Sequence, residues 1–267
     1  MKLLSGVTMF GSAIFVPVMV LGFLAIQAPT GIFYSPDIHF LIHGMIFLSA
    51  VLFVYFSLQG FRQTGSLRLL IISAGILLSA LLLLVHSLSR FWDGGRSGWY
   101  VWLGIVSAAF FLFLAVGLEE RLVEARHRRW FLFGFFCFIT LALFFSFILI
   151  ERAMSSNILV EATLNRWTPL GRFLQITSNV LLATASIRYL HGAFIIRSEI
   201  SLLFATGIVL LTMSTLTLGQ SYDEFDISFW IAHVWALFGY VVFGLGVYAA
   251  SRSFQHGGIY AEITTEK

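Results

Sequence analysis

The chain has 267 residues, of which 59% are hydrophobic and only 11% are charged, and its formal net charge is +3. A soluble domain usually carries about 25% charged residues, so this composition excludes a charged, water-facing surface and favours lipid as the solvent. The basic residues are dispersed among short loops without a basic stripe, which argues against nucleic acid as a partner. The sequence therefore predicts an all-α integral membrane protein in contact with membrane lipid.

Eight apolar segments are long enough to cross a bilayer as helices, which takes about 20 residues each. The first exceeds the apolar core of a signal peptide, about 7–15 residues, so we interpret it as a retained helix. The predicted spans are Val7–Gln27, Ile38–Gln59, Leu67–Ser89, Trp99–Leu118, Trp130–Ile150, Phe173–Leu190, Ile200–Leu218 and Phe229–Ala250. Residues 1–250 thus form one eight-helix transmembrane domain, and the polar residues 251–267 are expected to be a flexible cytoplasmic tail.

The Lys and Arg residues indicate how these spans are oriented. If the N-terminus is cytoplasmic, eleven of the 16 basic residues fall on the cytoplasmic side, four of them arginines in Glu119–Arg129. The eleven are Lys2, Arg62, Arg68, Arg121, Arg126, Arg128, Arg129, Arg188, Arg197, Arg252 and Lys267. Because cytoplasmic loops are enriched in Lys and Arg, both termini are predicted to lie in the cytoplasm.

Ionisable side chains are rare inside the predicted spans, and four histidines are the exception. The near absence of acidic and basic residues there argues against an ion-coupled transporter. His39 and His43 lie at the start of the second span, His86 near the end of the third, and His233 near the start of the last. With both termini in the cytoplasm, all four histidines lie at one level in the outer leaflet.

The spacing of the first two histidines suits a metal ion. His39 and His43 are four residues apart, so both side chains leave the same helix face and can share one ion. Neutral imidazole suits zinc, copper, iron or nickel. A b-type haem would need two histidines facing each other, and a pair on one helix face cannot flank a single haem. If the three histidine-bearing spans are neighbours, His86 and His233 join the same metal site.

Other polar residues extend this candidate site. Asn179, in a polar stripe of the sixth span with Gln175 and Ser178, is a candidate ligand-binding residue. Three acidic residues that precede histidine-bearing spans are candidate hydrogen-bond partners of the rings: Asp37, Asp223 and Asp226. Three interpretations of the four histidines stay open, namely hydrogen bonding between helices, a metal or haem site, and a ligand pocket without metal. No nucleophile motif, phosphate loop or dinucleotide fingerprint is present, so no enzyme is predicted.

Four stretches carry a resemblance to a known family. They are IHFLIHGMIFLSAVLFVYF from Ile38, LLLLVHSLSRF from Leu81, WTPLGRFLQITSN from Trp167 and FWIAHVWALFGYVVFGLGVY from Phe229. In these stretches the chain resembles the MASE3 type of membrane-associated sensor domain, found ahead of bacterial histidine kinases and diguanylate cyclases. His86 and His233 take the positions of two family histidines. The chain departs from the family at His43 or Gly44, where an acidic residue is expected, and near Trp235–Ala236, where an apolar residue replaces the expected lysine.

The resemblance implies a sensor-like module of the bacterial inner membrane whose outer pocket holds His39, His86 and His233. It supplies no output, because no kinase, cyclase or PAS region follows the spans in these 267 residues. The favoured hypothesis is a non-enzymatic sensory or accessory subunit that signals to a protein partner at its cytoplasmic face. The alternative is a metal- or haem-binding redox or structural subunit of a larger membrane complex.

Overall fold

The computed structural model describes residues 33–89, 97–118, 121–153, 160–161, 166–195, 199–221 and 225–255. The predicted first span, Val7–Gln27, lies outside these residues. The long helices are α2 (Pro36–Thr64), α3 (Leu67–Ser89), α4 (Ser97–Val116), α5 (Arg128–Ala153), α6 (Pro169–Ile195), α7 (Glu199–Leu218) and α8 (Ile227–Gln255). A 3₁₀ turn, η1 (Ala125–His127), precedes α5, and the short strands β1 (Val160–Glu161) and β2 (Arg166–Trp167) pair antiparallel between α5 and α6.

Six of these helices, α2, α3, α4, α5, α7 and α8, are long and apolar enough to cross a membrane. This confirms a helical, multi-pass membrane protein. Helix α6 forms where a span is predicted, but it is not among the six, and its polar residues Gln175, Asn179 and Arg188 account for its lower hydropathy. The count of eight spans and their orientation stay predictions. Helix α8 runs to Gln255, so the first residues of the expected flexible tail are helical.

Local sequence explains where the histidine-bearing helices begin and end. Pro36 occupies the first turn of α2, where its missing N–H costs no hydrogen bond. The helix stops at Gly65, whose positive φ of 79° lets its N–H reach the carbonyl of Phe61 at 2.7 Å. Asp226 begins α8, because its Oδ1 accepts the backbone N–H of Phe229 at 2.7 Å.

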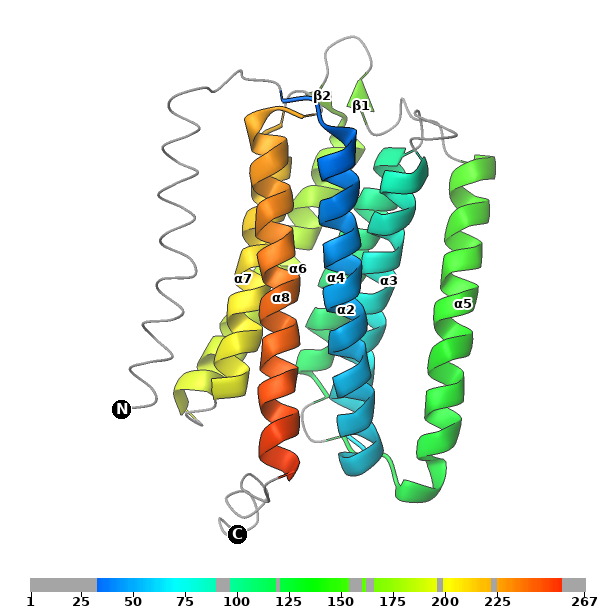
Figure 1. Cartoon of the computed structure of the whole chain (residues 1–267), viewed down its shortest axis with the longest axis vertical. Coiled ribbons are helices and arrows are strands. Elements are labelled where there is room, and N and C mark those ends of the chain that lie inside the picture. Colours follow the sequence, from blue (N-terminus) through cyan, green and yellow to red (C-terminus); the bar gives the residue numbers. More distant parts are fainter. Residues whose placement is uncertain are drawn as a thin grey trace.

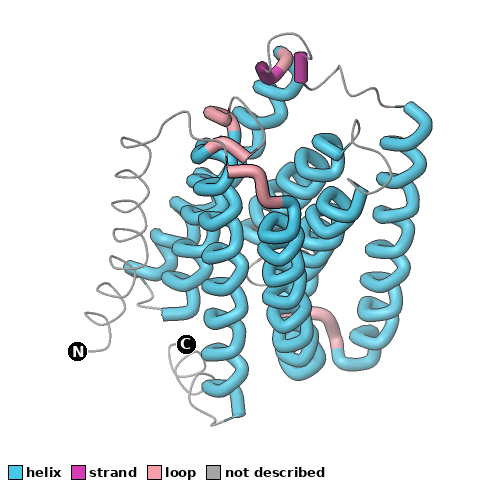
Figure 2. The backbone as a smooth tube through the Cα atoms, turned by 45° about the horizontal axis from the view of Figure 1, so that its top comes forward, coloured by secondary structure: helices cyan, strands magenta, loops and turns pink. Residues whose placement is uncertain are grey.

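Six helices form a closed ring, and α5 stands outside it (Figures 1 and 2). Around the ring, α2 packs on α3, α3 on α4, α4 on α6, α6 on α7, α7 on α8, and α8 again on α2. Close approach of α3 and α4 depends on Gly75, where a Cβ would lie 2.5 Å from the Cβ of Phe111. The ring brings α2, α3 and α8 side by side, as the predicted histidine site requires.

Helix α5 contacts α3, α4 and α2 only lightly among the described helices, and 17% of its most apolar stretch is buried. Its exposed side chains are large and aromatic, including Phe133, Phe144 and Phe145. Such a helix is hydrophobic on all sides, which is stable only when lipid or another protein covers it.

A cluster of three aromatic rings closes the middle of the ring of helices. Phe53 of α2, Phe204 of α7 and Phe243 of α8 contact one another, with centroids 5.7–6.1 Å apart. All three side chains are buried. Phe53 comes ten residues after His43 on α2, and Phe243 comes ten residues after His233 on α8. At about 1.5 Å per residue, the aromatic cluster lies about 15 Å along the bundle from the histidines.

The turn between α2 and α3 is joined to the loop that precedes α5, at the end of α2 opposite the histidines. Arg128 donates from Nη1 to the carbonyls of Arg62 and Gln63 at 2.8 and 2.9 Å, and from Nε to Val123 at 3.1 Å. Two backbone hydrogen bonds also link the segments: the Val123 N–H donates to the Gly65 carbonyl, and the N–H of Leu67, the first residue of α3, donates to the Arg121 carbonyl. The end of α2 and this basic loop therefore form one unit.

Candidate metal centre

The four predicted histidines converge at one end of the ring. His39 and His43 come from the first turns of α2, His86 from the last turn of α3, and His233 from the second turn of α8. Their exposed fractions are 1%, 1%, 4% and 8%, so all four side chains are removed from solvent. Buried imidazoles need partners for both ring nitrogens, which makes this cluster costly unless it is hydrogen-bonded or binds a ligand.

The imidazole rings are in direct contact. The His39 ring lies 4.3, 5.2 and 4.8 Å from the rings of His43, His86 and His233, measured between centroids. His43 and His233 are stacked at 5.0 Å with an interplanar angle of 24°. Phe229 covers the cluster, with its ring 5.2 Å from that of His39 and 4.2 Å from that of His233.

Hydrogen bonds fix which nitrogens of two of the histidines carry protons. His233 Nδ1 lies 2.7 Å from the Phe229 carbonyl, which only accepts, so Nδ1–H donates and Nε2 of a neutral ring keeps its lone pair. His39 Nε2 lies 3.1 Å from His233 Nε2 and must then donate to it. In this arrangement the lone pair of His39 is on Nδ1, and both nitrogens of His233 have partners.

Three of the histidines could hold a metal ion. One ring nitrogen each from His39, His43 and His86 lie within 4.8 Å of one another. Ligand nitrogens about 2.0–2.1 Å from a tetrahedral ion are about 3.3 Å apart, so modest side-chain rotations would close the set around one ion. His43 Nδ1 has no hydrogen-bond partner among the described residues, which leaves a donor atom for this purpose. His233 then holds a ligand, His39, in place through a hydrogen bond.

The geometry does not suit a haem between these histidines. A bis-histidine haem needs two imidazoles on opposite faces of a macrocycle. Here the rings of His39, His43 and His233 lie against one another, with no gap the width of a porphyrin between them. The donor set therefore fits a single ion.

The other predicted site residues have different surroundings. Asn179 is not with the histidines, because its Oδ1 accepts a hydrogen bond from the Thr215 hydroxyl between α6 and α7. Asp226 is buried, accepts from Ser221 Oγ at 3.0 Å and caps α8 through the Phe229 N–H, so it helps to place Phe229 and the helix beside the histidines. Asp37 is exposed, and Asp223 lies outside the described residues.

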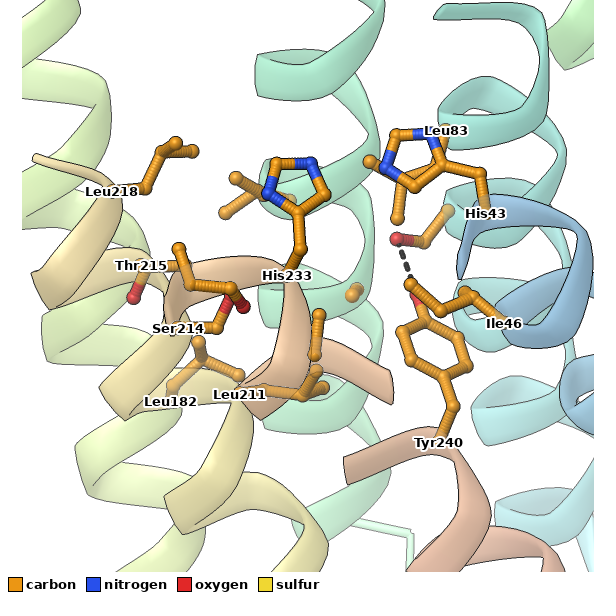
Figure 3. A pocket seen from close by; sticks show the side chains of 15 residues that line it. His43, Ile46, Leu83, Leu182, Leu211, Ser214, Thr215, Leu218, His233 and Tyr240 are labelled. Carbon is orange, nitrogen blue, oxygen red and sulfur yellow. Dashed lines mark hydrogen bonds between the residues drawn. The ribbon is translucent and has the colours of Figure 1, made fainter. Parts of the chain in front are cut away.

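A small cavity adjoins the histidines at the centre of the ring (Figure 3). Its volume is about 50 Å³, and every helix of the ring contributes to its wall. His43 and His233 line it on one side, and Tyr240 lies on another (Figure 3). Most of the remaining lining is aliphatic, as at Ile46, Leu182 and Leu211.

The hydroxyl groups of the cavity wall are hydrogen-bonded. Tyr240 donates to Ser79 Oγ at 2.7 Å, the dashed line in Figure 3. Ser214 Oγ donates to the carbonyl of Ala232 at 2.7 Å, and the Thr215 hydroxyl donates to Asn179 Oδ1, as described above. The cavity therefore offers few polar groups to a guest apart from the histidines.

The sequence analysis missed Tyr240 and Ser79, although a signal for both exists. Tyr240 follows His233 by seven residues, and Ser79 precedes His86 by seven. Seven residues are two helical turns, so each lies below a histidine on the same helix face.

No family model matches the chain, and neither the curated proteins nor the solved structures contain a significant match. The resemblance to the MASE3 type of sensor domain therefore stays a prediction, and function must be argued from the site.

Proposed function

We propose that this chain is a multi-pass membrane protein that binds one transition-metal ion through His39, His43 and His86. The observation that carries this proposal is that their ring nitrogens lie within 4.8 Å of one another, in a cluster removed from solvent. Two of these ligands are on α2 and one is on α3, so a bound ion would join the two helices. Buried imidazoles that hold a common ion satisfy their polar atoms, which accounts for the cost of burying them.

Copper in its singly charged state suits this donor set best. Three neutral imidazoles leave the charge of the ion uncompensated, and the metal-capable cluster contains no carboxylate among the described residues. The cost of placing an ion in an apolar medium rises with the square of its charge, which favours Cu(I) over divalent ions. Imidazole is an accepted ligand of copper.

The proposed role is sensory or accessory and not catalytic: occupancy of the metal site is passed to a protein partner. Helix α2 connects the histidines to its far end at Thr64, which is about 30–40 Å away at a rise of about 1.5 Å per residue. There Arg128 ties the carbonyls of Arg62 and Gln63 to the basic loop before α5. A displacement of α2 on metal binding would therefore reach this loop, where Arg126 and its ion-pair partner Glu124 are exposed on the surface.

The placement in the membrane is part of the same proposal. We take the chain to have eight spans with both termini in the cytoplasm of a bacterium and the histidines near the outer face of the inner membrane. The distribution of Lys and Arg supports this orientation. Lipid, and a partner at the cytoplasmic face, are then the expected neighbours.

Metal analysis tests the proposal directly. The full chain, purified in mild detergent and loaded anaerobically with Cu(I), should retain about one copper per chain after removal of excess metal. His86→Ala should retain less than about a tenth of that, because two ligands remain on one helix face. His191→Ala is the matched control, since His191 is exposed on α6. A metal-free wild-type protein, or equal copper in wild type and His86→Ala, would contradict the proposal.

The route through α2 gives a separate prediction. Copper loading should slow amide hydrogen exchange about threefold or more at Gly65, Leu67 and Val123, whose backbone groups join the turn and the basic loop. Arg128→Ala should retain copper but lose this protection, since it removes three hydrogen bonds to carbonyls. Arg129→Ala, at the next and exposed position, should behave as wild type. Unchanged protection in Arg128→Ala would exclude this route.

A further inference from the structure

The three-histidine set leaves a coordination position open. A tetrahedral ion takes four ligands, and sites with three protein ligands keep the fourth position for an exogenous molecule. His233, the nearest further histidine, uses Nδ1 for the Phe229 carbonyl and Nε2 for His39. It is therefore engaged as a hydrogen-bond partner and does not fill the fourth position in this arrangement.

The cavity adjoins the three-histidine set at one of its members, His43. His43 is both a metal-capable residue and part of the cavity wall. A cavity needs at least about 10–15 Å³ to hold one water molecule, so about 50 Å³ has room for a few water-sized molecules and accommodates a diatomic molecule. A larger organic ligand would have to displace packed side chains, such as Leu83 and Leu211.

The low polarity of the cavity wall determines which class of molecule the cavity can hold. The hydroxyls of Tyr240, Ser214 and Thr215 already donate to protein acceptors, and the rest of the wall is largely aliphatic. Ordered water needs two to four polar partners, and apolar cavities stay dry. A small uncharged molecule loses little hydration on entering such a space, whereas an anion would lose much.

From these observations we propose that the bound metal takes a neutral diatomic gas as its fourth ligand, and that the central cavity holds this gas. The inference rests on the proposed metal site and names its ligand. Binding is a coordination step: the gas donates an electron pair to Cu(I), no bond is broken and no electron is transferred. The protein would then be a sensor of such a gas, with copper as its receptor.

Carbon monoxide is the probe, because its stretching vibration reports coordination to Cu(I). Copper-loaded wild-type protein should bind about one molecule of carbon monoxide per copper, with one infrared band that disappears when the gas is removed. Copper without a carbon monoxide band would overturn the inference and leave the metal site intact. A wild-type protein that binds no copper would overturn the proposed function itself, and this inference with it.

Two variants of α4, which carries none of the four histidines, test the role of the cavity. Ala108→Leu and Ile105→Phe each add bulk to its wall, and either serves if the other fails to fold. Each should keep copper but bind carbon monoxide at least about tenfold more weakly. Ala142→Leu on α5, outside the cavity, is the matched control and should behave as wild type. Wild-type affinity in both folded α4 variants would overturn the role of the cavity.

Discussion

Loading the protein with Cu(I) is expected to raise its thermal unfolding midpoint by about 8–15 °C, and His43→Ala should abolish this increase. An ion that binds only the folded state stabilises it by about 4 kcal/mol when free metal is a thousand times the dissociation constant. For a chain of this size, each kcal/mol corresponds to about 2–4 °C. His43 is chosen because its ring contacts the other three histidines of the cluster.

The measurement is thermal unfolding in detergent with and without copper, followed by tryptophan fluorescence. The metal-free midpoint of His43→Ala separates the loss of packing from the loss of metal binding. His127→Ala, in the exposed turn before α5, should keep the full copper-dependent increase. An equal increase in His43→Ala would place the stabilising ion elsewhere.

Removal of His233 is expected to weaken copper binding by about 10–100-fold without changing the number of histidine ligands. Residues that hydrogen-bond to a ligand fix its ring orientation, and their loss typically costs this much affinity. In His233→Leu, the Nε2–H of His39 loses its acceptor on His233. The orientation and the tautomer of the His39 ring are then no longer fixed by this hydrogen bond. His233→Gln retains an acceptor and should recover part of the affinity.

Two measurements on these variants separate a positioning residue from a ligand. Competition with a chromogenic Cu(I) chelator gives the affinity, and X-ray absorption of the copper gives the number of histidine ligands. Three histidines are expected both in the wild type and in His233→Leu. If the wild type showed four histidine ligands and His233→Leu showed three, His233 would be a metal ligand. It would then occupy the fourth coordination position that is proposed for the gas.

Much of this architecture was predictable from sequence because membrane helices follow from composition and length. The predicted second and third spans coincide with α2 and α3 to within a turn or two, since runs of apolar residues admit few alternatives. Helix α6 was harder to place, because Gln175 and Asn179 lower its hydropathy while their side chains bond to α7. Hydropathy does not distinguish a polar residue that faces another helix from one that ends a span.

The four histidines of the candidate site were predictable as a group, but their separate roles were not. Predicting that the four histidines lie at one level required only the direction in which three helices cross the membrane. That His233 is a hydrogen-bond partner of His39 depends on the Phe229 carbonyl, a backbone group that no sequence pattern marks. The central cavity depends on the order of helices around the ring, which side-chain patterning alone does not determine.

The aromatic cluster of Phe53, Phe204 and Phe243 is an apolar layer between the histidines and the opposite end of α2 and α8. Its rings fill the space between α2, α7 and α8 with groups that carry neither charge nor hydrogen-bonding protons. Ions and protons cross such a layer only at a high energetic cost. Under the proposed function, a metal ion would therefore reach the histidines from the side of this layer on which they lie. The signal proposed to reach the opposite face would be a movement of α2 and not a transfer of charge.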